Sequence, residues 1–271
     1  MNRRLQTVGY GILCVVILLG IVLTGWLTSS EAIATHLDQR NLAPSLAHPF
    51  GTDWLGRDMF TRTAKGLLLS IGVGVMAAAS SSVIALALGA AAGALGGAVD
   101  RIIRWVMDLF LSVPHLISLI LISFIAGGGV RGIVLGIAFT HWPSLSRLIR
   151  AEILQLRSAE YVQASRRLGR SRWWVVSRHM LPHVAPQFAI GLLLIFPHAI
   201  LHEAALTFLG MGLSPHQPAI GVILSESMRY LSTGMWWLAF FPGLCLLLVV
   251  RLFDRIGENV RRLADPRQSH E

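Results

Sequence analysis

Long stretches without a charged residue recur along this chain. Residues 67–99 contain no Asp, Glu, Lys or Arg, and residues 8–27 and 230–250 are equally free of charge. A transmembrane helix needs about 20 consecutive apolar residues to cross roughly 30 Å of hydrocarbon. Because 54% of the residues are hydrophobic and only 14% are charged, we expect an all-α integral membrane protein. Six spans are predicted: residues 8–27, 67–99, 109–130, 131–147, 179–202 and 230–250.

Three of these spans have individual features. Residues 67–99 are too long for one straight crossing and too short for a hairpin, so they are interpreted as one helix with a glycine-rich end. Residues 109–130 are predicted as one span with Pro114 near its start. Residues 131–147 are short, and we expect this helix to extend past its flanking arginines, whose long stems can reach the interface.

Positive charge predicts the orientation. With six spans and a cytoplasmic N-terminus, 17 of the 23 Lys and Arg residues fall on the cytoplasmic side and six on the other. Cytoplasmic loops retain positive charge, so both termini are expected in the cytoplasm. Nucleic-acid binding would explain the basic charge poorly, because no basic stretch is interleaved with stacking aromatics on a soluble domain.

The most basic segment lies between the fourth and fifth spans. Ser158 is expected to cap a short helix and Gly169 to end it in the left-handed conformation. One face of this helix collects Tyr161, Ala164, Ser165 and Leu168. Ser171 is expected to cap a second short helix, which Pro182 ends. The segment is either a docking site for a soluble partner or a basic loop that rests on anionic lipid.

The residues of this segment resemble a known pattern. Gln163-Ala164-Ser165, then Gly169, His179 and Leu181-Pro182, are similar to the E-A-A-x3-G-x9-I-x-L-P loop of binding-protein-dependent ABC importer permeases. The spacing matches throughout, while Gln163, Ser165 and His179 depart from Glu, Ala and Ile. The resemblance implies a coupling helix that sits in a groove of an ATPase subunit. Its implied contact residues are Tyr161, Gln163, Ala164, Ser165, Gly169, Leu181 and Pro182.

Further segments resemble the peptide and nickel branch of that family, second-subunit type. Residues 48–58 are similar to its H-x-x-G-T-D-x-x-G-R-D motif, and residues 203–212 to its E-A-A-L-S-F-L-G-L-G. The first motif supplies a predicted internally paired structure outside the cytoplasm, made of Gly51, Asp53, Gly56, Arg57 and Asp58. The resemblance implies a type I importer permease with six transmembrane helices in a bacterial inner membrane.

The chain lacks a phosphate-binding loop. Such a loop needs Gly-Lys-Ser/Thr, but the only lysine is Lys65, between Ala64 and Gly66. We therefore expect no ATP site in this chain, and the resemblance implies a permease subunit that is not an enzyme and forms half of a pathway. The expected partners are a second homologous permease, two ATPase subunits that alone bind ATP, an extracytoplasmic binding protein and membrane lipid.

Histidines are the only indication of the cargo. His198 and His202 are four residues apart and share one helical face, a spacing that can place two imidazoles on one metal ion, and His141 lies in the preceding span. The alternatives are packing, an exit to the interface, or pairing of His202 with Glu203 or a backbone carbonyl. Resemblance to nickel-type members favours transient nickel, another transition metal or a metal chelate as cargo, with no covalently bound cofactor. Dipeptide or oligopeptide cargo is the alternative.

Two other functional classes remain for comparison. Residues 202–206 resemble the zinc-protease helix H-E-x-x-H, but leucine replaces the second histidine, so a membrane enzyme is disfavoured. A passive channel would not need a coupling helix. The predicted organisation is a first helix with its extracytoplasmic segment (residues 1–66), a permease core (67–260) containing the coupling loop (147–186), and a cytoplasmic tail (261–271).

Overall fold

The computed structural model describes residues 3–29 and 34–264, and these form a helical protein whose only strand-like pairing is an isolated β-bridge between Thr52 and Asp58. The predicted all-α class is confirmed. The helices are α1 (Arg3–Leu27), α2 (Met59–Leu95), α3 (Gly97–Ser112), α4 (His115–Ile125), α5 (Gly129–Arg157), α6 (Glu160–Arg167), α7 (Arg172–Val175), α8 (Leu181–Phe208), α9 (Ile220–Met228) and α10 (Trp237–Ala264).

Four helical segments are long and apolar enough to cross a membrane, namely Val8–Leu27, Met59–Leu95, Arg172–Phe208 and Trp237–Leu263. A fifth follows if the bent pair α3 and α4 counts as one span. Helix α5 has 29 residues, which corresponds to about 43 Å and exceeds the hydrocarbon thickness. It extends past Arg131 and Arg147, as predicted, and would be the sixth span. The count of six stays a prediction.

The third predicted span is wrong as a single helix. Residues 109–125 are divided between α3 and α4, whose axes differ by 102°, and Gly129 and Val130 already belong to α5. The break lies at Val113 and Pro114, where Val113 has an extended backbone with ψ of 138°. Proline disfavours the helical conformation of the residue before it, so Val113 leaves the helix and α4 restarts after Pro114. This bend places the start of α4 beside α5 and α8.

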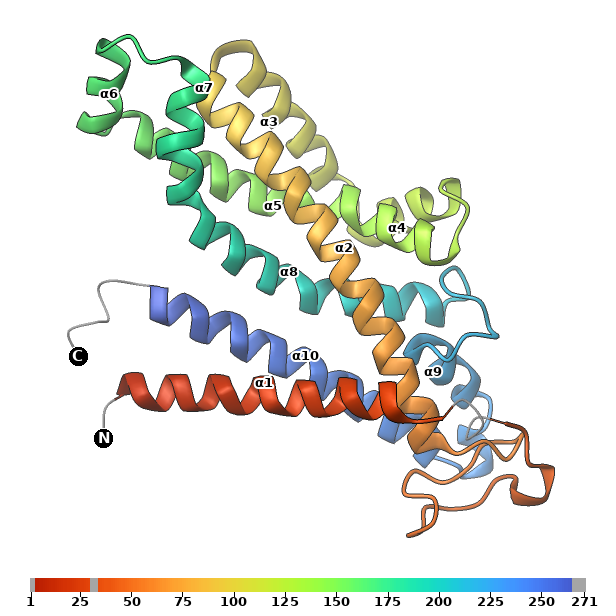
Figure 1. Ribbon diagram of the computed structural model, residues 1–271. Helices are drawn as coiled ribbons and strands as arrows, with labels where there is room; N and C mark the ends of the chain where they lie inside the picture. Colours follow the sequence, from red (N-terminus) through yellow and green to blue (C-terminus); the bar gives the residue numbers. More distant parts are fainter. Residues whose placement is uncertain (1–2, 30–33, 265–271) are drawn as a thin grey trace.

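The two ends of the molecule differ in character. Figure 1 shows α6 at the same end of the helical body as the start of α1 and the end of α10, whereas the irregular segment before α2 and helix α9 lie at the opposite end. The start of α1 and the end of α10 therefore lie on the side of α6, while the cytoplasmic placement of both termini stays a prediction. The predicted tail, residues 261–271, begins within α10, and its part beyond Ala264 lies outside the described residues.

Small residues let α2 lie directly against α5. A Cβ atom at Gly89 would lie 2.7 Å from the backbone oxygen of Ser146, and one at Gly93 would lie 2.8 Å from the Ile153 side chain. Close approach of small residues is the usual way in which helices associate in lipid, where apolar side chains gain little by leaving the bilayer. Helix α2 also crosses the predicted boundary between residues 66 and 67, and ends at Gly96 (φ 66°).

Candidate functional site

Helix α6 is held by one buried side chain. Val162 is fully buried and packs in a core cluster with Val175 and Met180 of the following segment. The other face is open: Tyr161 is 48% exposed and Leu168 82% exposed. Gln163 and Ala164 are also exposed. An apolar face exposed at the end of a short basic helix is suited to contact another protein.

The limits of α6 differ in part from the prediction. Ala159 occupies the N-cap position without a side-chain bond, while Ser158 ends α5 and donates its hydroxyl to the carbonyl of Gln155. The predicted Ser158 cap is therefore wrong, because α5 continues ten residues beyond Arg147. Gly169 follows the helix with φ of 79°. This left-handed conformation is the one that favours glycine, as expected.

The side chain of Gln163 links α6 to the residue that follows α5. Its amide nitrogen donates to the carbonyl oxygen of Ser158 at 3.1 Å. An ionised Glu, which the resembled pattern has here, could not donate this bond. The departure from the pattern thus adds a local contact that holds the entry of α6.

The other two departures from the pattern contact each other. The Ser165 hydroxyl donates to the Tyr161 carbonyl at 3.0 Å and lies 3.0 Å from Nε2 of His179. The His179 ring also packs edge-on against Tyr161 and Trp174. Ala and Ile would form an apolar contact at this point; here a hydrogen bond links α6 to the helix that continues into α8.

The second short helix does not end at Pro182. Ser171 caps α7 by accepting from the backbone N–H of Trp174, as predicted. Residues Val176–Met180 then form a π-helical turn, and Pro182 lies in the first turn of α8. Proline has no N–H to donate, and it is tolerated here because the adjoining π-helical turn interrupts the regular pattern of backbone hydrogen bonds. A continuous helical segment therefore runs from Arg172 to Phe208.

A cavity of about 440 Å³ lies between the end of α3, the start of α4, and helices α5 and α8. Apolar side chains such as Leu111 and Ile195 line much of it, with polar groups from Thr140 and Ser144. Histidines contribute from three helices: His115 from α4, His141 from α5, and His198 and His202 from α8.

Three of the four histidines converge. One ring nitrogen each from His115, His141 and His202 lies within 4.8 Å of the others, and their ring centroids are 4.5, 4.7 and 5.0 Å apart. His198 lines the cavity but does not belong to this group, which departs from the predicted pairing of His198 with His202. His115 was not predicted from the sequence; its position directly after Pro114 was the available signal.

The motif at residues 48–58 folds around Asp53, which is fully buried. One carboxylate oxygen accepts from the backbone N–H groups of Leu55 and Arg57 at 2.9 and 3.0 Å. The other accepts from Nε of Arg57 at 2.6 Å and from Nη1 of Arg62 at 3.1 Å. Arg62 also pairs with Glu226 of α9, so the network ties the segment before α2 to a distant part of the chain.

Asp58 and the two glycines of the motif shape the same turn. Asp58 caps α2 by accepting from the Thr61 N–H at 2.8 Å and lies 3.0 Å from Nδ1 of His48. Gly51 and Gly56 have φ of 72° and 73°, and a Cβ at Gly56 would lie 1.7 Å from the His36 carbonyl oxygen. The turn therefore requires glycine at position 56 for space as well as for conformation.

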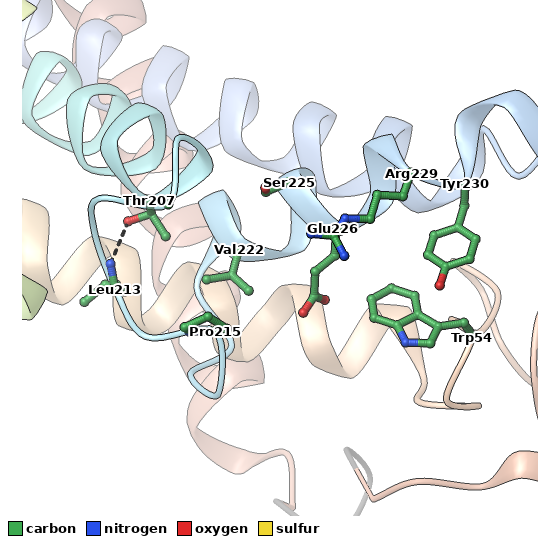
Figure 2. A pocket seen from close by; sticks show the side chains of 10 residues that line it. Trp54, Thr207, Leu213, Pro215, Val222, Ser225, Glu226, Arg229 and Tyr230 are labelled. Atoms are coloured by element: carbon green, nitrogen blue, oxygen red, sulfur yellow. Dashed lines mark hydrogen bonds between the residues drawn. The ribbon is translucent and has the colours of Figure 1, made fainter.

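A second cavity, of about 340 Å³, lies beside this network. Figure 2 shows the Trp54 and Tyr230 rings facing each other at one end and the Glu226 carboxylate projecting between them and Pro215. The two rings are stacked with centroids 4.9 Å apart. At the other end, Thr207 accepts from the Leu213 N–H at 3.2 Å. Trp54 thus packs against Tyr230, just beyond the end of α9.

Comparison with known proteins gives one family. Residues 85–265 match the model of the family described as binding-protein-dependent transport system inner membrane component. The dipeptide transport system permease protein of Bacillus subtilis (strain 168) is 31% identical over 98% of this chain and 83% of its own length. The probable D,D-dipeptide transport system permease protein of Escherichia coli (strain K12) is 34% identical over 96% of this chain and 87% of its own.

The fold also resembles that of solved proteins. A chain of the MetNI methionine ABC transporter in an inward-facing conformation superposes with a TM-score of 0.61, covering 76% of this chain and 98% of that chain. The sequences are 16% identical, so this likeness concerns the fold alone.

Proposed function

Because the chain belongs to the family of binding-protein-dependent transport system inner membrane components, we propose that it carries short peptides through the membrane. It is a permease subunit of an ABC importer, with the type I importer fold, and a multi-pass protein of a bacterial inner membrane. It works with a second permease, ATPase subunits and a substrate-binding protein, and it is not itself an enzyme because its partners hydrolyse ATP.

The observation that carries the peptide assignment is the agreement among relatives. Proteins named for dipeptide and oligopeptide transport are 31 to 34% identical to this chain over 96 to 98% of its length. The cavity between α3, α4, α5 and α8 has a volume of about 440 Å³, within the range of about 300–1,000 Å³ typical of small-molecule sites. It supports a pathway along these helices, completed by the partner permease.

Energy enters through α6 in this proposal. The exposed face formed by Tyr161, Ala164 and Leu168 docks on an ATPase subunit, and the buried Val162 transmits the displacement to the body of the protein. Because α7, the π-helical turn and α8 form one segment, motion of α6 tilts α8 and changes the access of the cavity. Leu181 and Pro182 lie in the first turn of α8, and Gly169 lies in the turn between α6 and α7.

A metal or metal chelate such as a nickel complex is the second candidate cargo. The relatives are named for peptides, which favours the peptide over the metal expected from the sequence. One observation keeps the metal in consideration: His115, His141 and His202 converge in the cavity.

The test is uptake by the complete importer in proteoliposomes supplied with its binding protein. We expect ATP-dependent accumulation of a radiolabelled dipeptide that stops when the ATPase subunits carry a disabled ATP site. Uptake that continued without ATP hydrolysis would contradict the importer function. Uptake of free Ni²⁺ in the absence of any peptide transport would replace the peptide cargo by the metal.

A further inference from the structure

We propose that His115, His141 and His202 bind one divalent transition-metal ion. We also propose that the importer takes up its peptide cargo as a chelate with this ion. The three residues come from α4, α5 and α8, so the site exists only in the folded protein. The cargo part of this inference rests on the proposed importer function, whereas binding of the ion does not.

Hydrogen bonds to backbone carbonyls leave one nitrogen of two of the three rings free to bind an ion. Nδ1 of His202 donates to the backbone carbonyl of His198 at 2.7 Å, and Nδ1 of His141 to that of Ile137 at 3.2 Å. A carbonyl oxygen only accepts, so both rings carry their proton on Nδ1 and keep the lone pair on Nε2. Metal-ligating histidines usually donate their other ring nitrogen to a carbonyl or carboxylate in this way.

Two of the three histidines have a buried ring nitrogen without a partner among the described residues. Nε2 of His141 and Nε2 of His115 are buried and have no hydrogen-bond partner there. A buried polar atom without a partner costs about 1–3 kcal/mol. Coordination would satisfy both atoms at once, which packing of three imidazoles against one another does not.

The distances are close to those of a coordinated ion. Three nitrogens bound at about 2.1 Å in a tetrahedral site lie about 3.4 Å from each other. The nitrogens here lie within 4.8 Å of one another. Side-chain rotations that move each nitrogen by roughly 1 Å would bring them to coordination distance of one ion. The α3–α4 break supplies a natural place for such adjustment, because His115 directly follows it.

The ligand set selects the class of metal. Three neutral imidazoles without a carboxylate suit Ni²⁺, Co²⁺, Cu²⁺ or Zn²⁺, whereas Mg²⁺ and Ca²⁺ prefer oxygen ligands. Three protein ligands leave at least one coordination position open. This position faces a cavity large enough for a small molecule, so an amino, amide or carboxylate group of a peptide can complete the coordination.

The first experiment measures Ni²⁺ binding to the purified complete importer by calorimetry and by metal content after dialysis. Replacing His115, His141 and His202 together with alanine is expected to abolish one bound ion per complex. Since losing even a second-shell partner costs about 10–100-fold in affinity, each single replacement should weaken binding at least about 100-fold. His→Gln replacements, with ATPase activity as the assembly check, repeat the test if the alanine variants do not fold.

His198→Ala is the matched control, because His198 lines the same cavity but lies outside the converging group. It should retain Ni²⁺ affinity within about threefold. Equal Ni²⁺ content in the wild type and the triple variant would overturn the proposal. A second outcome would also overturn the proposal: His198→Ala and His202→Ala lose Ni²⁺ binding equally, and His115→Ala loses none. The pair of histidines on α8 would then hold the ion.

The second experiment separates the site from the cargo. ATP-dependent uptake of glycyl-histidine, a peptide that chelates Ni²⁺, is measured with and without equimolar Ni²⁺. The triple variant should lose the Ni²⁺-dependent increase in glycyl-histidine uptake, measured relative to its own uptake of the same peptide without Ni²⁺. Unchanged Ni²⁺-dependent uptake would overturn the chelate proposal. If no dipeptide were transported by the wild type, the proposed function would fail while the Ni²⁺ titration still decided the site.

Discussion

Replacing Asp53 with alanine is expected to damage assembly of the protein more than its affinity for cargo. The side chain is fully buried and accepts four hydrogen bonds, two from backbone N–H groups and two from arginines. Removing the Asp53 carboxylate leaves the guanidinium group of Arg62 with Glu226 as its remaining acidic partner, and the Arg62 side chain is only 3% exposed. A buried charge that loses one partner costs about 3–5 kcal/mol.

This free energy converts into a measurable melting shift. For chains of this size about 1 kcal/mol lowers Tm by roughly 2–4 °C, so Asp53→Ala should lower the Tm of the detergent-solubilised complex by roughly 6–20 °C. Asp53→Asn keeps one oxygen for the two backbone donors but loses both charged bonds. Its loss should still reach about 3 kcal/mol, because each of the two lost hydrogen bonds to a charged group is worth about 1.5–3 kcal/mol.

Asp38→Ala serves as the control, because Asp38 is exposed in the same segment and its replacement should leave Tm unchanged. Complex yield, Tm and the KM of dipeptide uptake are measured together for all three variants. Normal yield and Tm for Asp53→Ala, with selectively weakened affinity for the peptide, would refute the structural role. The residue would then belong to cargo recognition.

Three further predictions concern α6 and the α2–α5 contact. Ser165→Ala leaves Nε2 of His179 without its present partner and should lower the free energy of unfolding by about 1 kcal/mol. The double variant Ser165→Ala with His179→Ile should recover part of this loss, and thermal melts of the single and double variants give the coupling free energy between the two positions. Gly93→Ala places a Cβ 2.8 Å from α5 and should cost about 1–3 kcal/mol in stability, while Gly72→Ala, with nothing within 4 Å, should be neutral; equal Tm for both would contradict the packing argument. Leu168→Glu puts a charge on the exposed α6 face and should abolish cargo-stimulated ATPase activity without lowering Tm; normal stimulation would show that this face does not dock.

The apolar spans were predictable because partition into lipid depends on local composition. Residues 8–27, 179–202 and 230–250 all overlap helices long enough to cross a membrane, and Gly169 adopts the left-handed conformation expected from its neighbours. Errors arose where a neighbouring element decided the outcome. Ser158 does not cap α6 because α5 continues to Arg157, and Pro182 lies in the first turn of α8 because the helix before it continues through a π-helical turn.

The candidate metal site could be predicted only in part. His141 and His202 were identified from their place in apolar spans, but the periodicity of one helix paired His202 with His198. Periodicity describes which residues share a face and carries no information about which other helices contact that face. The 102° bend between α3 and α4 brings His115 into the group.

The sequence by itself determined that this protein lies in a membrane, where most of its membrane helices are and to which family it belongs. Hydropathy and motif spacing are properties of consecutive residues. Tertiary structure alone decided which distant groups meet: Asp53 with Arg62 and Glu226, Ser165 with His179, and three histidines from three helices. Such contacts depend on how helices bend and cross. A break at one proline or a missing Cβ at one glycine changes them without changing the hydropathy that places each helix in the membrane.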